Sequence, residues 1–214
     1  MNQIIFRPYQ TNDRAAVQEI AYDTAFFGDS GQAFFTDRII LSEVLTAYFT
    51  DYEPTSCFIA EKDNLVIGYL IGTKQADKVF RYFYTKILPG LLVKSIYRGV
   101  FFKFKNIKFI SNLVRSYLRG EFELPESIKS YPATLHINVR AGYRNFGIGA
   151  KLIETYCQYL IREKIAGVHL QTMSENASRF FQQQGFVILQ QNKRTYFRYL
   201  LHKDIPIYLC GKKL

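Results

Sequence analysis

Two glycines and two basic residues stand close together in a stretch that could bind a phosphate group. Gly147 and Gly149 follow Arg144 and precede Lys151. If a helix begins at the glycines, its first amides have no acceptor within the helix, and the helix dipole adds positive potential there. Glycine keeps that backbone open, and the two basic residues add charge. These residues predict an anion site, and a tight turn built with two glycines is the alternative interpretation.

The elements that must position this stretch can be predicted from its neighbours. Residues Thr134–Val139 are apolar and β-branched and follow a proline, which is typical of a strand. A turn is expected over Arg140–Phe146. A helix is expected from Gly147, because apolar residues then recur at helical spacing: Ile148, Leu152, Ile153, Tyr156, Tyr159 and Leu160.

Two well-known phosphate loops are excluded by spacing, because the chain has no G-x-x-x-x-G-K-[ST] and the glycines do not follow G-x-G-x-x-G. The segment Arg144–Gly149, RNFGIG, resembles the signature [QR]-x-x-G-x-[GA] of the GNAT acetyltransferase superfamily. Gly185 and Phe186 resemble the later Gly-Phe turn of that family. The resemblance covers residues 131–201 well and residues 3–73 loosely.

The resemblance implies the fold. We expect an α/β protein with a mixed, mostly antiparallel sheet, a splayed central strand pair and flanking helices. Residues 1–214 are expected to form a single domain. Residues 74–130 exceed the ordinary family architecture and are predicted to be a helical, basic and aromatic insertion.

The resemblance also implies an acyl-CoA donor, most simply acetyl-CoA. The backbone of Ile137, Asn138 and Val139 would pair with the pantetheine arm. Amides of the signature would hold the pyrophosphate, and these belong to Arg144, Asn145, Phe146, Gly147, Ile148, Gly149 and Ala150. Ser174, with Asn176 two residues later, matches an asparagine that touches the pantetheine. The acceptor would be a primary amine of a small molecule or peptide.

The proton-handling residues of the family are not all present. Many members have a carboxylate at the start of the central strand, where this chain has Ala133 and Thr134. Many use a tyrosine as the acid at the position of Phe181. His136, in the middle of the predicted central strand, is the best substitute for a base, because imidazole titrates near neutral pH. A structural, hydrogen-bonded histidine is nevertheless the preferred interpretation of His136, with the general base as the alternative, and a structural role is also preferred for His169.

Two tyrosines are weaker candidates for the acid. Tyr196 and Tyr199 lie in the segment Thr195–Leu201, which we predict to be a closing strand paired with Phe186–Gln190. The segment Ile205–Cys210 is expected to add an edge strand.

The positive charge of the chain is concentrated in one segment. The net charge is +10, and Ala76–Gly120 holds ten basic residues against Asp77 alone, a balance of +9. Pro89 and Gly90 are expected to separate its helices. We expect a helical cap, with a basic surface for an acidic protein or an anionic membrane surface as the alternative. No nucleic-acid-binding signature occurs, which argues against such a partner.

The remaining composition indicates a globular chain, with 48% hydrophobic and 21% charged residues. The sequence shows neither a signal peptide nor a transmembrane segment, and its three cysteines suit a reducing compartment, so a cytoplasmic location is expected. No metal-ligand spacing occurs. Two hypotheses follow: a CoA-dependent N-acyltransferase, or a catalytically weak binding module of the same fold that senses CoA or docks an anionic partner.

Overall fold

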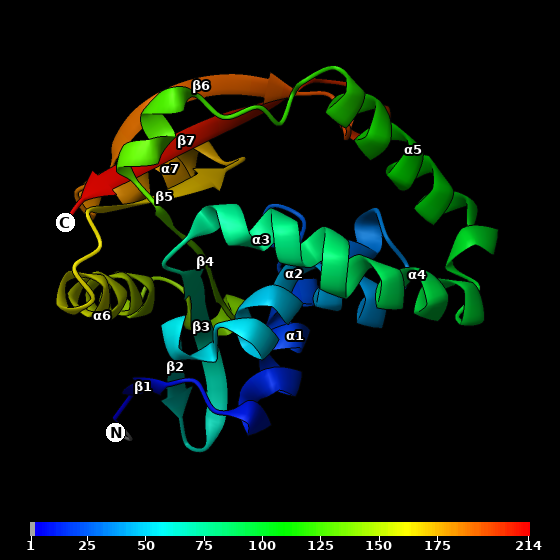
Figure 1. Ribbon diagram of the computed structural model, residues 1–214. Coiled ribbons are helices and arrows are strands. Elements are labelled where there is room, and N and C mark those ends of the chain that lie inside the picture. The colour runs from blue at the N-terminus through cyan, green and yellow to red at the C-terminus, as the bar shows by residue number, and fades with distance from the viewer. Residues whose placement is uncertain (1–2) are drawn as a thin grey trace.

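The computed structural model describes residues 3–214, and a seven-stranded mixed sheet organises them (Figure 1). The strand order is β1-β2-β3-β4-β5-β7-β6, and every neighbouring pair is antiparallel except β4 and β5. The strands are β1 (Ile5–Pro8), β2 (Cys57–Lys62), β3 (Leu65–Thr73), β4 (Ala133–Val139), β5 (Gly167–Thr172), β6 (Val187–Arg194) and β7 (Ile205–Lys213). The predicted α/β fold with a mixed sheet is confirmed.

Helices cover both faces of the sheet (Figure 1). They are α1 (Arg14–Asp23), α2 (Arg38–Tyr52), α3 (Ala76–Tyr82), α4 (Leu88–Tyr97), α5 (Phe104–Leu118), α6 (Ile148–Arg162), α7 (Glu175–Gln183) and α8 (Arg198–Leu201). Successive side chains of a strand point to opposite faces, and two hydrophobic clusters result. One includes Ile59 and Ile71 with α1, α2 and the insertion, and the other includes Ala60 and Leu70 with α6 and α7.

The central helix α6 has the inward face that the sequence predicts. Ile148, Leu152, Ile153, Tyr156 and Leu160 are all buried in the second cluster. The Tyr156 hydroxyl donates to the carbonyls of Thr73 (3.1 Å) and Thr134 (3.0 Å), at the last residue pair shared by β3 and β4. The helix that carries the predicted anion site is therefore held firmly against the middle of the sheet.

The chain between β3 and β4 is helical as expected, but its break is not at the predicted place. Helix α3, the π-helical turn η4 (Phe83–Ile87) and α4 follow one another directly, so Pro89 and Gly90 lie in the first turn of α4 and separate nothing. Proline removes one hydrogen bond from this continuous helix, and the wider π turn η4 lies directly before the position where that bond is missing. The reversal comes at Gly99, whose φ of +65° ends the helix before η5 (Val100–Phe102).

Helix α5 closes over the first hydrophobic cluster. The Phe109 ring stacks on Phe197 at 5.6 Å and lies 4.6 Å from Phe34, between ring centroids. The buried Asn106 side chain accepts from the Thr36 amide at 2.8 Å and donates to the Val100 carbonyl at 3.2 Å. This inner face behaves as the expected helical cap.

The C-terminal prediction was wrong in two respects. Residues Thr195–Leu201 are not a strand: they turn after β6 and include the short helix α8. The partner of β6 is β7, which lies between β5 and β6 and is not an edge. In this position β7 is hydrogen-bonded on both sides and buries Ile207, Leu209 and Cys210. An interior position is therefore more stable than an edge position for the apolar segment Ile205–Lys213.

Within residues 3–214, no helix combines the length and the apolar character needed to cross a bilayer. The three cysteines, Cys57, Cys157 and Cys210, are buried and unpaired, and burial raises the pKa of the Cys57 thiol to about 12.

Candidate functional site

The parallel pair β4 and β5 separates after two residue pairs. Ala133 pairs with Val168 and Thr134 with His169, and no further pair joins the two strands. Strand β4 continues to Val139 and remains paired with β3 on its other side. The backbone of Ile137–Val139 is therefore without a strand partner on the β5 side, and the predicted splay is confirmed. An extended amide-containing chain could pair with this open edge.

The turn after β4 leads directly into the N-terminus of α6. Asn145 and Gly147 both adopt left-handed backbone conformations, with φ of +68° and +74°. Gly147 is the residue before the helix, and no side chain among residues 3–214 caps the first amides of α6. A Cβ built on Gly147 would meet no atom within 4 Å. The helix N-terminus is thus open to a ligand, and its amides and dipole favour an anion.

The two basic side chains expected to face the anion, Arg144 and Lys151, bind protein groups instead. Arg144 donates from Nη2 to the Gly28 carbonyl (2.7 Å) and from Nε to the Val139 carbonyl (3.2 Å). Lys151 pairs with Glu154 at 2.9 Å on the surface of α6. Arg144 therefore ties the turn to the loop after α1, and backbone amides supply most of the anion-binding capacity.

Gly149 is needed for close packing. A Cβ at this position would lie 3.1 Å from the ring of Phe180 and 3.8 Å from the Ile137 side chain. Phe180 belongs to α7, so this glycine lets α6 and α7 approach each other beside the open edge of β4. Gly149 is thus required for the close packing of α6 and α7, and Gly147 for its left-handed backbone conformation.

The three residues predicted to bind the donor at α7 lie in three different environments. The Ser174 hydroxyl caps α7 by accepting from the Ala177 amide at 3.4 Å, so its side chain is already engaged. Asn176 is exposed. Phe181 is buried in the second cluster against Phe186, and contributes apolar contact only.

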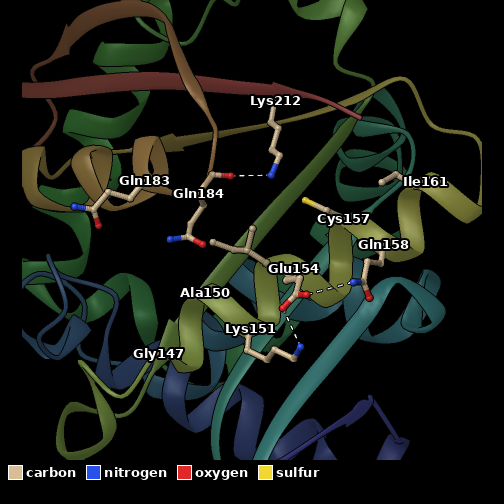
Figure 2. Close-up of a pocket in the computed structure, with 11 residues that line it drawn as sticks. Gly147, Ala150, Lys151, Glu154, Cys157, Gln158, Ile161, Gln183, Gln184 and Lys212 are labelled. Carbon is tan, nitrogen blue, oxygen red and sulfur yellow. Dashed lines mark hydrogen bonds and ion pairs between the residues drawn. The ribbon is translucent and has the colours of Figure 1, made fainter.

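A groove of about 520 Å³ runs along the outside of α6, as Figure 2 shows. It begins at Gly147, Ala150 and Lys151 and extends past Cys157 toward the end of α7 and β7. Lys212 of β7 closes it by donating to the Gln184 carbonyl at 2.7 Å. Sequence reasoning missed Gln183, Gln184 and Lys212, since no motif links the end of the chain to α6.

His136 lies on the face of β4 opposite Leu135 and Ile137. It is paired with Ile71, and paired residues of an antiparallel ladder share a face, so it points to the side of α1, α2 and the insertion. The His136 side chain remains exposed to solvent, and the protein atoms packed around it remove part of the water from the imidazole. Desolvation lowers the pKa of His136, so the imidazole is neutral near pH 7.

The other titratable candidates are more enclosed. The Tyr196 hydroxyl is buried and donates to the Met173 sulfur at 3.1 Å, and burial raises its pKa. The Tyr199 hydroxyl is buried without a hydrogen-bond partner within the described residues, and burial raises its pKa also. His169 is buried with Nδ1 at 2.7 Å from the Tyr131 carbonyl, which fits the structural interpretation.

A second set of polar contacts near the start of β4 was not foreseen. The Glu53 carboxylate accepts from Ser56 Oγ (2.9 Å), the Lys74 amide (2.8 Å), Thr73 Oγ1 (2.5 Å) and the Tyr48 hydroxyl (3.2 Å). These bonds join the end of α2 to the end of β3. No three His, Cys, Asp or Glu side chains gather into a metal-binding group within residues 3–214.

Comparisons with known proteins agree with this geometry. Residues 124–186 match the model of the acetyltransferase (GNAT) family. No curated protein matches the chain. The solved structure of SsHAT has 24% identity and a TM-score of 0.73, over 99% of this chain and 98% of that chain.

Two further solved structures are similar at lower identity. Salmonella typhimurium yncA, solved with its cofactor acetyl-CoA, has 13% identity and a TM-score of 0.60, over 100% of this chain and 95% of that one. Drosophila melanogaster polyamine N-acetyltransferase has 12% identity and a TM-score of 0.60, over 99% of this chain and all of that one (100%). These likenesses show the fold, and the predicted resemblance is confirmed.

Proposed function

Because residues 124–186 match the GNAT acetyltransferase family and residues 3–214 take its fold, we propose that the protein is an N-acyltransferase that transfers an acetyl group from acetyl-CoA to a primary amine. One observation carries the proposal. The open edge of β4 leads, through a glycine turn, into the uncapped N-terminus of α6. A backbone edge followed by an anion site suits a molecule with an amide arm and a pyrophosphate.

The residues present fit this donor in three places. The unpaired backbone of Ile137–Val139 would hold the pantetheine amides by strand-like pairing. The amides around Gly147–Ala150 would receive the pyrophosphate. The groove along α6 offers Lys151 and Lys212 to the phosphate of the adenosine end, so the whole donor would follow one path beside α6 (Figure 2).

The acceptor amine would approach from the other face of β4. Acetyl-CoA supplies an acyl carbon activated as a thioester, and the protein must deliver an unprotonated amine to it. His136 lies on that face and is neutral near pH 7, so its imidazole can accept the proton of the ammonium group. We assign it as the general base.

Fewer side chains can serve as the acid that protonates the departing thiolate. Phe181 cannot supply a proton, and Tyr196 is committed to Met173. Of the two tyrosines, Tyr199 has the buried hydroxyl that no hydrogen bond engages within the described residues. We propose that Tyr199 or solvent returns the proton.

Two features support the alternative of a binding module without turnover. The carboxylate that many GNAT enzymes have at the start of the central strand is replaced by Ala133 and Thr134, and their tyrosine is replaced by Phe181. Acetyl-CoA binding is common to both hypotheses, so only turnover separates them. The three unpaired thiols support a reducing, cytoplasmic location.

The test combines binding and turnover. Calorimetry with acetyl-CoA measures donor binding, and release of the CoA thiol is followed with a panel of polyamines, aromatic amines and peptide N-termini. We expect donor binding and thiol release with at least one amine, and loss of turnover without loss of binding in His136→Ala. Binding with no turnover on any amine would favour the binding module, and absence of binding would reject both hypotheses.

A further inference from the structure

The solvent side of α5 carries a stripe of apolar side chains. Phe104, Ile107, Val114 and Leu118 are separated by three, seven and four residues, so they lie on one side of the helix. All four are exposed, Phe104 and Leu118 at 77%. This is unusual for large apolar side chains that stand together on one element.

The stripe is not required by the fold, because α5 has a separate inner face. Asn106 and Ser116 are fully buried, and Phe109 and Leu113 pack on the first hydrophobic cluster. These inner residues fall on the opposite side of the helix from Phe104 and Leu118. The helix therefore presents one apolar face to the core and a second one to solvent.

Basic residues border the outer stripe. Lys108 and Arg115 each follow a stripe residue by one position, and Lys103 and Lys105 flank Phe104. None of these four takes part in an ion pair with the described part of the chain. Lys108 lies over the rings of Phe104 (5.9 Å) and Tyr199 (5.1 Å), and no acidic residue occurs from residue 78 to residue 120. The positive charge is thus available to an external anion.

The corner between α4 and α5 also exposes large apolar side chains beside a basic residue. Tyr97 is 87% exposed and Phe102 is 86% exposed, beside Lys103. In Figure 1 this corner lies at the right margin, away from the sheet, and is one of the most protruding parts of the molecule. Exposed rings on a projecting corner can enter a soft surface without a matching pocket.

We propose that the α4–α5 corner and the outer face of α5 dock on an anionic phospholipid membrane surface. Apolar side chains that alternate with lysines suit this interface, because the rings enter the boundary of headgroups and acyl chains while the lysine ends stay among the phosphates. An acidic protein surface without apolar side chains would satisfy the charges, but it would leave the apolar stripe in water. The proposal concerns a surface and does not depend on acyl transfer.

Sedimentation of the full chain with vesicles tests the docking. Vesicles of phosphatidylcholine alone are compared with vesicles that contain about one third phosphatidylglycerol, at about 0.1 M and about 1 M salt. We expect binding to the anionic vesicles at low salt, weakened at least about tenfold at high salt or without the anionic lipid, because each basic residue near the surface contributes about fivefold.

Two sets of variants separate the apolar and basic contributions. Phe102→Ser with Phe104→Ser and Leu118→Ser should weaken binding at least about tenfold, since each removes exposed apolar surface that would enter the lipid. The matched control, Ile5→Ser with Leu65→Ser and Val187→Ser, removes three exposed apolar side chains elsewhere and should bind like the native chain.

The charge pair is tested in the same way. Lys103→Gln with Arg115→Gln should weaken binding to anionic vesicles, and Lys164→Gln with Lys213→Gln, which removes the same net charge from exposed positions just before β5 and at the end of β7, should not. Circular dichroism verifies that each variant is folded.

Three results would overturn the proposal. The first is no binding of the native chain to anionic vesicles. The second is binding that the apolar substitutions do not change while polyglutamate competes for it, which would assign the surface to an acidic protein. The third is a dimer in sedimentation velocity that the substitutions at Phe102, Phe104 and Leu118 abolish, which would assign the stripe to self-association.

Discussion

Substitution of Gly147 by aspartate is the sharpest test of the donor site. The matched control is Gly147→Asn, which has nearly the same shape. Both variants place a side chain at φ +74°, and a Cβ there meets no atom within 4 Å, so neither produces a clash. Asn and Asp tolerate this conformation better than other non-glycine residues, and each should cost about 1 kcal/mol of folding stability. The difference between the two variants is therefore the charge.

The magnitude follows from the position of residue 147 before the first turn of α6. Two unit charges about 5 Å apart repel by about 3 kcal/mol at an effective dielectric constant of about 20, and solvent at this open site reduces that to about 2 kcal/mol. Acetyl-CoA affinity should then be about 30-fold lower for the aspartate than for the asparagine variant. The asparagine variant should remain within about threefold of the native chain, because its side chain can turn into open space.

Stability should change in the opposite direction. A carboxylate at a helix N-terminus is favourable by about 0.5 kcal/mol, so Gly147→Asp should be slightly more stable than Gly147→Asn in chemical denaturation without ligand. Calorimetry gives the affinities. Equal acetyl-CoA affinity in the two folded variants would refute an anion site at this turn. Lower stability of the aspartate variant would refute the reasoning about the helix N-terminus.

Three further predictions concern His136 and Glu53. His136→Ala should lower kcat about 100-fold or more and leave acetyl-CoA affinity unchanged, and the loss of kcat on the acid side of the pH profile should disappear with it; an unaltered profile would return His136 to a structural role. The lowered pKa of His136 also makes folding depend on pH, since the unfolded chain binds a proton first as the pH falls below about 6.5. The free energy of unfolding, measured by urea denaturation, should therefore be highest above about pH 6.5 and decrease as the pH falls toward the folded-state pKa of His136. The decrease should be smaller in His136→Asn, and equal dependence of the unfolding free energy on pH in the two proteins would contradict the assignment. Glu53→Ala should destabilise the fold by about 2–4 kcal/mol, because it leaves the Lys74 amide and three hydroxyl groups without their acceptor, and Glu53→Gln should cost less; a loss below about 1 kcal/mol for the alanine variant would contradict this role.

The candidate donor site could be predicted because its parts are neighbours in the chain. The strand, the turn and the first amides of α6 lie within residues 133–150, and backbone amides at a helix N-terminus need no distant partner. The buried face of α6 was predictable for the same reason, since helical spacing alone selects Ile148, Leu152 and Tyr156.

Contacts between distant segments could not be predicted in this way. Arg144 was expected to face the anion, but it binds the Gly28 carbonyl, 116 residues away in the chain. The apolar content of Thr195–Leu201 indicated a strand, and only the pairing of β7 with both β5 and β6 leaves that segment outside the sheet. A strand is selected by the neighbours available to it, which local composition does not contain.

The amino-acid sequence by itself determined the glycine turn, the helix that follows it and the concentration of positive charge between β3 and β4, because each depends on residues that are adjacent or one helical turn apart. The tertiary structure decided three other properties: the place of β7 between β5 and β6, the packing around the imidazole that lowers the pKa of His136, and the side of α5 that is left in solvent. All three depend on which elements pack together, and burial is a property of the assembled fold.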